Sequence, residues 1–149
     1  MKLQKGITGF DANPSFNQEE LITILKNVKQ PFLKEGDLIK PNESSNFYQQ
    51  KIKHEKSKKE FYLLINSTYL IFSCVENSRC YDLRFIDFPI ELISQLKQEV
   101  NSSIIVLDRK ELLQNVSKED LTELGESEVK QIKYWNTKSL GEIVFNCFD

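Results

Sequence analysis

The sequence has few of the residues on which metal and catalytic sites usually depend. It contains a single histidine, three cysteines without a CxxC pair, and five glycines that stand singly along the chain. A zinc site needs three or four Cys, His or carboxylate ligands at characteristic spacings, and Cys74, Cys80 and one histidine do not supply them. A phosphate-binding loop needs clustered glycines, which are missing. We therefore expect no metal and no other cofactor.

The residues for acid–base catalysis do not form a recognisable set. His54 lies among five lysines between positions 51 and 59, which is typical of a solvated histidine on a polar strand, and a catalytic base would need positioned partners. The 22 acidic residues offer many pairs, but no spacing singles one out. We expect a protein that is not an enzyme. The alternative is a small cytosolic enzyme or nucleotide-binding module that uses these scattered carboxylates.

Long hydrophobic runs are absent as well. The longest, residues 61–65 and 103–107, are far shorter than the roughly 20 residues of a transmembrane helix. The opening MKLQKGITGF lacks the apolar segment of a secretory signal. We therefore expect a cytoplasmic protein that does not contact a membrane. Because structural disulfides are rare in that compartment, Cys74, Cys80 and Cys147 are expected to be reduced thiols.

The overall composition has no excess of charge of one sign. The formal net charge is −2, whereas nucleic-acid-binding domains usually carry a large basic excess, so direct nucleic-acid binding is not expected. A chain of 149 residues most often makes one domain and buries about 70% of its unfolded surface, so it needs no disulfide or metal for stability. We expect one domain over residues 1–149 and a monomer.

The first third of the chain predicts one helix between irregular segments. Residues 2–10 indicate a strand or extended arm, which two glycines weaken. A helix begins at Asn17, which forms a variant capping box, and ends at Pro31. Residues 32–46 are expected to form a loop, with at most a short strand at 37–40. The predicted buried face of the helix consists of Leu21, Ile24, Leu25 and Val28.

The middle of the chain predicts an antiparallel meander of about four strands. Residues 47–55 are a polar candidate, and 61–65 and 68–75 are rich in aromatic and β-branched residues. Asn66-Ser67 between the latter two is expected to form a tight turn. Residues 81–85 alternate between apolar and charged side chains, which is typical of a half-buried strand.

Two further elements are predicted after the meander. Asp87 and Pro89 indicate the start of a helix. Residues 103–107 are continuously apolar, which favours a strand buried on both faces. The predicted buried face of the helix consists of Ile90, Ile93, Leu96 and Val100.

Short helical segments are expected from residue 108 onward. Asp108 begins one that carries Leu112, Leu113 and Val116. A further turn is predicted to run from Ser117 through Leu124 and to end at Gly125. For residues 128–135, extended and helical conformations both remain open.

The end of the chain carries the strongest helical pattern. Ser139 is placed as an N-cap, and Glu142 three residues later completes a capping box. The expected buried side of this C-terminal helix consists of Leu140, Ile143, Val144, Cys147 and Phe148. With these elements we predict an α+β (mixed α/β) fold, in which helices pack on a twisted sheet.

Charge gathers in two segments that suggest a binding surface. Residues 51–60 hold five lysines and two acids; lysines often protect a hairpin from edge pairing, and the alternative is contact with phosphates or an acidic partner. Residues 117–128 hold five acids and one lysine. Such a segment steers a basic partner toward the protein. We predict that partner-binding residues are Glu119, Asp120, Glu123, Glu126 and Glu128.

Tyr134 and Trp135 stand immediately before the predicted last helix. Trp135 is interpreted as a core anchor whose N–H donates to a carbonyl. The alternative is an interface hot spot, because tryptophan and tyrosine are enriched at such positions.

The end of the chain, YWNTKSLGEIVFNCFD, and its opening MKLQKGITGF resemble those of a family of small bacterial immunity proteins. The family form has a YW pair, a polar turn, a G-[ED]-hydrophobic-hydrophobic-F-N segment and a terminal aromatic-Asp pair. This chain has Cys147 and Asn136 where a second tryptophan and often a proline are expected.

The resemblance implies a role beside a polymorphic toxin, including those of contact-dependent growth inhibition systems. Such an immunity protein binds the C-terminal domain of the cognate secreted toxin, often a nuclease with a basic cleft, and blocks its active site in the producing cell. The resemblance covers only the two ends of the chain.

Overall fold

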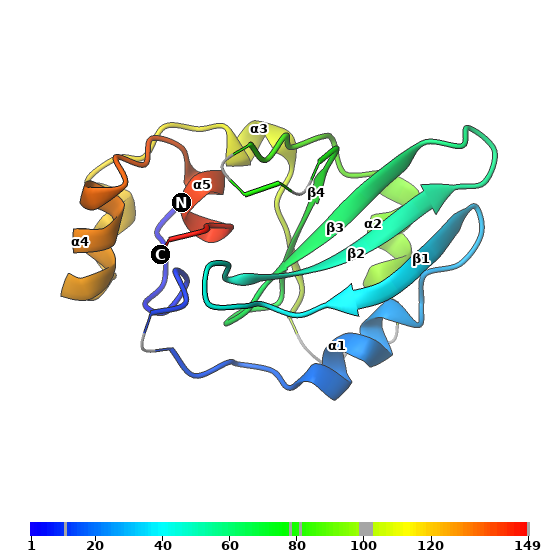
Figure 1. Cartoon of the computed structure of the whole chain (residues 1–149), viewed down its shortest axis with the longest axis horizontal. Coiled ribbons are helices and arrows are strands. Elements are labelled where there is room, and N and C mark those ends of the chain that lie inside the picture. Colours follow the sequence, from blue (N-terminus) through cyan, green and yellow to red (C-terminus); the bar gives the residue numbers. More distant parts are fainter. Residues whose placement is uncertain (11, 78, 81, 99–102, 149) are drawn as a thin grey trace.

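A five-stranded sheet in the order β1-β2-β3-β4-β5 forms the centre of the protein (Figure 1). The structure, a computed structural model, describes residues 1–10, 12–77, 79–80, 82–98 and 103–148. The first four strands pair antiparallel and the fifth runs parallel to the fourth, so the predicted α+β fold is confirmed. The strands are β1 Phe32–Ile39, β2 Phe47–His54, β3 Glu60–Asn66, β4 Ile71–Val75 and β5 Ile105–Val106.

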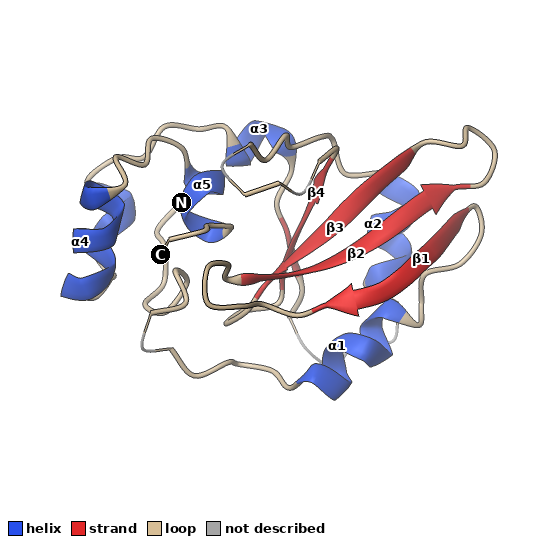
Figure 2. Cartoon of the chain, in the orientation of Figure 1, coloured by secondary structure: helices blue, strands red, loops and turns tan. Residues whose placement is uncertain are grey.

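Both faces of the sheet are covered by other parts of the chain. Side chains alternate along each strand, so each strand contributes residues to both faces. In β3, Leu63 and Ile65 point to one face and Leu64 to the other, and all three are fully buried. The helices α1 (Gln18–Leu25) and α2 (Ile90–Leu96) pack on the first face. On the second face lie the N-terminal segment and the short helices of the last third of the chain (Figure 2).

Helix α1 begins as predicted but ends early. The side chain of Asn17 accepts a hydrogen bond from the Glu20 N–H at 2.8 Å, which satisfies a donor of the first turn. Leu21, Ile24 and Leu25 are buried on the sheet. The helix stops at Leu25, well before Pro31, so proline is not what ends it.

Two segments of the first third differ from the prediction. Residues 2–10 form successive turns rather than a strand, with Gly6 and Gly9 at φ of 92° and 90°, in the left-handed region that glycine adopts readily. The predicted loop at 32–46 contains the eight-residue strand β1. Its outer side faces solvent and its register shifts between Glu35 and Ile39. An edge strand of this kind carries the polar composition of a loop.

The predicted meander has the right number of antiparallel strands but one wrong member. β1 is the first strand, whereas in 81–85 only Phe85 makes an isolated bridge, to Val75, and Tyr81 lies outside the described residues. The Asn66-Ser67 turn is also wrong, because Asn66 ends β3 and β4 begins at Ile71. The Asn66 side chain instead accepts from the N–H groups of the next turn.

Helix α2 and strand β5 occupy the predicted places with different buried faces. Leu92 and Leu96 are buried in α2, whereas Ile90 is 81% exposed; Val100 lies outside the described residues. β5 has two residues at the sheet edge, and Ile105 is 45% exposed. The prediction that 103–107 is buried on both faces is therefore wrong.

Three short helical segments follow β5. Helix α3 (Arg109–Leu112) has the predicted start, with the Asp108 N–H donating to the Glu111 carboxylate. The segment 117–124 contains only the 3₁₀ turn Glu119–Leu121. Gly125 does not end a helix but is the N-cap of α4, Glu126–Tyr134, so the segment left open at 128–135 is helical.

The last helix, α5 (Leu140–Val144), is shorter than the pattern suggested. Ser139 accepts from the Glu142 N–H at 3.4 Å, as predicted, but the Glu142 carboxylate accepts from the Lys138 N–H. Cys147 and Phe148 lie in the tail beyond the helix, where they are nevertheless buried with the other residues of the predicted face. The prediction that these five residues are buried is thus confirmed, although Cys147 and Phe148 are not part of the helix.

Cys80 and Cys147 form a disulfide, with their Cα atoms 5.8 Å apart. The expectation of three reduced thiols is wrong for this pair, which lies 67 residues apart in the sequence. No local spacing indicates a pairing that only the folded chain brings together. Cys74 is the free cysteine, and burial raises the pKa of its thiol well above the usual value.

We predict that alkylation in denaturant without reductant modifies one cysteine, Cys74, and that alkylation after reduction modifies three, as read by intact mass. Cys80→Ser should lower the free energy of unfolding by about 2–4 kcal/mol, because the crosslink restricts the unfolded chain. As a control, reductant should lower the stability of the wild type and leave that of Cys80→Ser unchanged. Modification of all three cysteines without reductant would contradict the disulfide.

We predict that Val144→Asp destabilises the fold by roughly 3–5 kcal/mol, because Val144 is fully buried and the new carboxylate would have no partner. Thermal unfolding measures the change. The matched control is Ile90→Asp at a position 81% exposed, which should alter stability by no more than about 0.5 kcal/mol. Equal melting temperatures for the two variants would show that the α5 face is not a core face.

Candidate partner-binding surfaces

Three buried asparagines hold the N-terminal segment and α5 against the sheet. The Nδ2 groups of Asn46 and Asn66 each donate to the backbone carbonyls of both Ile7 and Val144, at 2.8 to 3.0 Å. Asn146 Nδ2 donates to the Thr8 carbonyl at 3.1 Å and to the carbonyl of Ile143 in α5 at 2.9 Å. This cluster joins residues 7–8 and 143–146, on the second face of the sheet, to the ends of β2 and β3.

Glu128 is an internal anchor of the same segment. Its side chain is only 2% exposed. One carboxylate oxygen accepts from the N–H groups of Gly6 and Gly125 at 2.9 and 3.2 Å, and the other accepts from the N–H and hydroxyl of Thr8. Four donors on one buried carboxylate satisfy it without a cation. Burial therefore removes Glu128 from any surface that a partner can contact.

The carboxylate of Asp120 also accepts hydrogen bonds from within the protein. It accepts from the Ser117 N–H at 2.8 Å and from the terminal amine of Met1 at 3.3 Å. Burial alone would raise the pKa of this carboxyl, but the bonds from Ser117 and the amine outweigh it and lower the pKa. Because the pKa of Asp120 is lower in the folded state than in the unfolded state, the ionised carboxylate stabilises the fold at neutral pH. This stabilisation is lost as the pH falls through the folded-state pKa.

The predicted acidic surface is therefore smaller than its sequence suggests. Glu119, Glu123 and Glu126 are exposed, whereas Asp120 and Glu128 are buried at 8% and 2% exposure. Charge spacing does not distinguish an exposed carboxylate from a buried one that accepts backbone N–H groups. For the three exposed acids, partner binding stays a prediction.

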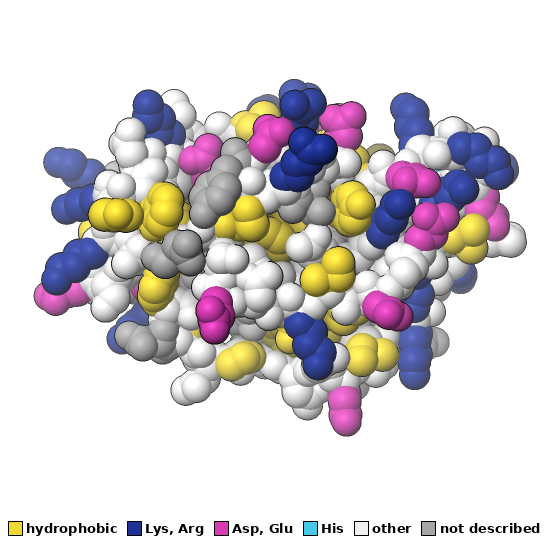
Figure 3. Space-filling view, in the orientation of Figure 1, with side chains coloured by type: hydrophobic (Ala, Val, Ile, Leu, Met, Phe, Trp, Pro, Cys, Tyr) yellow, Lys and Arg dark blue, Asp and Glu magenta, His cyan; other side chains and the backbone are white. Residues whose placement is uncertain are grey.

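The lysine-rich segment is the β2–β3 hairpin. Lys51 and Lys53 lie near Glu35 and Glu60, with the Lys51–Glu60 pair at 3.0 Å. The lysines of the turn are exposed, and basic side chains are prominent at that end of the molecule (Figure 3). His54 closes the turn, where its Nδ1 accepts from the Ser57 N–H at 3.2 Å. The turn is solvated, as expected, but β2 lies between β1 and β3, so protection of a sheet edge does not explain Lys51 and Lys53.

The structure distinguishes the two residues of the Tyr134–Trp135 pair, and the role of the pair as an interface hot spot stays a prediction. Trp135 is half-buried, stacks on Phe148 at 6.2 Å and donates from Nε1 to the Gln131 side-chain oxygen at 3.2 Å. Tyr134 meets it edge-on at 5.3 Å and is itself 78% exposed. Trp135 is thus an anchor at the edge of the core, and Tyr134 is the large aromatic side chain presented to solvent.

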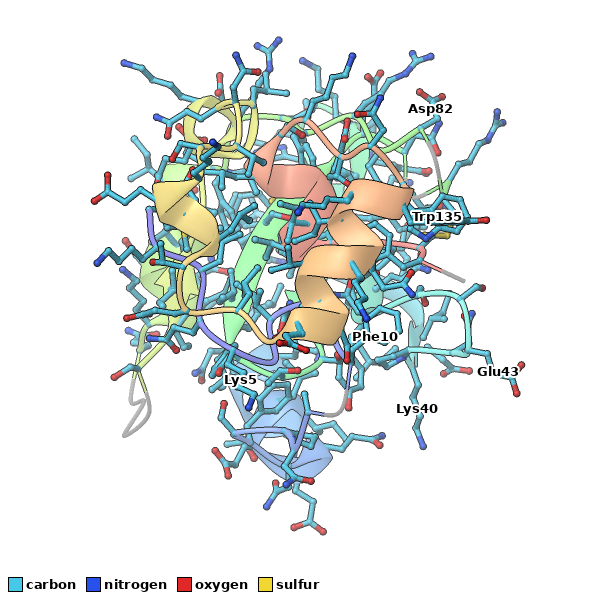
Figure 4. All side chains as sticks on the ribbon, turned by 90° about the vertical axis from the view of Figure 1, so that its left-hand side faces the viewer. Lys5, Phe10, Lys40, Glu43, Asp82 and Trp135 are labelled. Atoms are coloured by element: carbon cyan, nitrogen blue, oxygen red, sulfur yellow. A yellow bond between two sulfur atoms is a disulfide. The ribbon has the colours of Figure 1, made fainter. Side chains whose placement is uncertain are left out.

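A hollow of about 410 Å³ opens beside this pair, between the end of α4, the 82–85 segment and the C-terminal tail. We call it the Trp135 hollow; Figure 4 shows Trp135 and Asp82 on the same side of the molecule. Its floor is aromatic and aliphatic, and two exposed carboxylates lie on its rim. The lining consists of Asp82, Leu83, Phe85, Leu113, Trp135, Thr137, Ser139, Glu142, Phe145, Asn146, Cys147 and Phe148.

The described residues contain neither a group of metal ligands nor a helix that could span a membrane. Within the described ranges, no group of three or more His, Cys, Asp and Glu side chains could hold a metal ion. None of the helices in the described part of the chain is both long and apolar enough to cross a membrane. The expectation that the protein needs no cofactor stays a prediction.

Comparisons with models of protein families, with curated proteins and with solved structures found no match. The resemblance of the two ends of the chain to immunity proteins therefore rests on the residues quoted for it.

We predict that Glu128→Gln lowers the free energy of unfolding by about 1–3 kcal/mol. The new amide NH₂ would face backbone N–H groups in place of an acceptor oxygen, which leaves buried donors unpaired. Chemical denaturation measures the change. Glu126→Gln, at an exposed position two residues away on another side of α4, is the control and should be nearly neutral. A neutral Glu128→Gln would show that the carboxylate does not anchor the N-terminal segment.

Proposed function

We propose that this protein is an immunity protein that binds the C-terminal domain of a cognate secreted toxin and blocks its active site. It would act in the cytoplasm as a monomer without a cofactor, and would contact neither nucleic acid nor membrane. The toxin domain is a nuclease with a basic cleft. The proposal rests on the resemblance of both ends of the chain to such proteins and on one structural observation.

The observation that carries the proposal is the exposed aromatic pair at the end of α4. Tyr134 is 78% exposed and meets the half-buried Trp135 edge-on at 5.3 Å. A tyrosine ring that stays in contact with water adds little to the stability of the isolated protein. Tyrosine and tryptophan side chains do, however, supply much of the binding energy of protein interfaces. The pair is also the YW of the quoted resemblance. The exposed acids Glu119 and Glu123 would favour approach of a basic partner.

The proposal expects a gene for a large secreted toxin directly upstream of the gene for this chain, and the test uses the C-terminal domain of that toxin. We expect the purified protein to bind this domain tightly and to protect cells that express it. Tyr134→Ala should weaken the affinity by roughly 30-fold, or about 2 kcal/mol, as truncation of a hot spot does. Ile90→Ala, a truncation at an 81% exposed position on α2, is the control and should leave affinity unchanged. Because disulfides are rare in a reducing cytoplasm, binding is measured with and without reductant.

Charge reversal separates the two charged surfaces in the same assay. Reversing Glu119, Glu123 and Glu126 to lysine should slow association and weaken its dependence on salt. Reversing Lys56, Lys58 and Lys59 to glutamate should have no such effect. The opposite pattern would assign the hairpin as the interface with an acidic toxin. Failure of the wild type to bind or to protect would overturn the proposed function.

A further inference from the structure

We propose that the Trp135 hollow binds an arginine side chain of the partner protein. This inference rests on the proposed function for the identity of the partner, and on the chemistry of the hollow for the identity of the side chain. The site differs from the acidic segment around Glu119, which the sequence indicated.

The floor of the hollow favours a flat, weakly hydrated cation. Trp135 and Phe148, stacked at 6.2 Å with 7° between their planes, contribute aromatic surface, and Leu83 and Leu113 contribute aliphatic surface. An arginine packs its methylene stem on aliphatic groups, and its guanidinium interacts favourably with aromatic rings and is less hydrated than an ammonium. Leu113 is 53% exposed, so a ligand at this position would cover apolar surface.

The rim of the hollow is negative. Asp82 and Glu142 both line it, and no lysine or arginine does so within the described part of the chain. Glu142 accepts a hydrogen bond from the Lys138 N–H at 3.3 Å, which leaves its second oxygen to other donors. Two carboxylates that face one partly apolar hollow repel each other, and a cation between them relieves that repulsion. A guanidinium has five N–H donors in a fork, a geometry suited to bonding with carboxylates.

Two other hollows differ from the Trp135 hollow in the charged side chains that line them. One of about 810 Å³ next to α2 is lined by residues of both signs, including Lys59 and Glu91. Another of about 290 Å³ beside the buried asparagines has walls of mixed character, which include Phe10 and Phe148, and a single carboxylate, Glu43. Of these three hollows, the Trp135 hollow is the one that combines a tryptophan with two carboxylates and no lysine or arginine in its lining.

Arg84 is the internal competitor for this site. Its guanidinium lies 3.5 Å from Asp82, with the two side chains 64% and 52% exposed. An exposed pair of this kind is weak, so an incoming arginine can displace it. Removing Arg84 should therefore strengthen the binding of an external arginine, an effect that a purely structural role for Asp82 would not produce.

The first experiment needs no toxin, because Trp135 is the only tryptophan of the chain and its fluorescence reports on the hollow. The probe is the peptide acetyl-Gly-Arg-Gly-amide, and the control is its citrulline isostere, which has the same shape without charge. We expect a saturable change in emission with the arginine peptide, which weakens as salt is added, and none with citrulline. Equal responses to the two peptides, or no saturable response to arginine, would overturn the proposal.

Substitutions of the two rim carboxylates test whether they bind the arginine peptide. Asp82→Asn with Glu142→Gln keeps acceptor oxygens but removes both charges, and should weaken the arginine peptide at least tenfold. Arg84→Gln should strengthen it. The control pair Glu19→Gln and Glu91→Gln removes two exposed charges elsewhere and should change nothing. Wild-type affinity in the rim variant would overturn the proposal.

The toxin domain then separates the two proposals. Tight binding of the toxin to the wild type, with at least a tenfold loss in the rim variant, supports both. Tight binding that is equal in wild type and rim variant overturns the arginine site and leaves the proposed function intact. A toxin domain that does not bind, together with saturable binding of the arginine peptide, overturns the proposed function and leaves the arginine site supported.

Discussion

The structure depends on a small set of side-chain amides that satisfy buried backbone carbonyls. Asn46 at the start of β2 and Asn66 at the end of β3 donate to the same two acceptors, the carbonyls of Ile7 and Val144. Neither acceptor belongs to the sheet, and each would be buried without a partner if the amides were removed, at a cost of about 1–3 kcal/mol per group. The asparagines therefore join the N-terminal segment and the short helices on the second face, which together form a second layer, to the sheet by polar bonds within an apolar core.

This junction explains the irregular form of the second layer. The N-terminal segment is a series of turns, and the adjoining helices are short, so few of their backbone groups are paired within regular structure. Asparagine amides and the carboxylate of Glu128 take the place of a ladder or a helix. The disulfide between Cys80 and Cys147 fixes the tail from the other side.

Sequence reasoning succeeded where the signal was local. The Asn17 cap and the buried residues of α5 followed from spacing and capping chemistry. It failed for β1, an edge strand with the polarity of a loop, and for the disulfide, which depends on tertiary proximity. In the candidate site, it singled out the aromatic pair but could not tell the exposed Glu119 from the buried Glu128, because only the fold supplies the donors that occupy a carboxylate.

The asparagine cluster also has a consequence for the order in which the chain can fold during synthesis. Asn66 and its acceptor Val144 are 78 residues apart, and Asn146 and Thr8 are 138 apart. The antiparallel strands β1–β4 can pair once β4 has been made, but the amides of Asn46 and Asn66 find their second acceptor, the Val144 carbonyl, only when the residues around 144 are available. Native packing on the second face of the sheet must therefore wait until residues 144–146 have left the ribosome, and such non-local closure is slow.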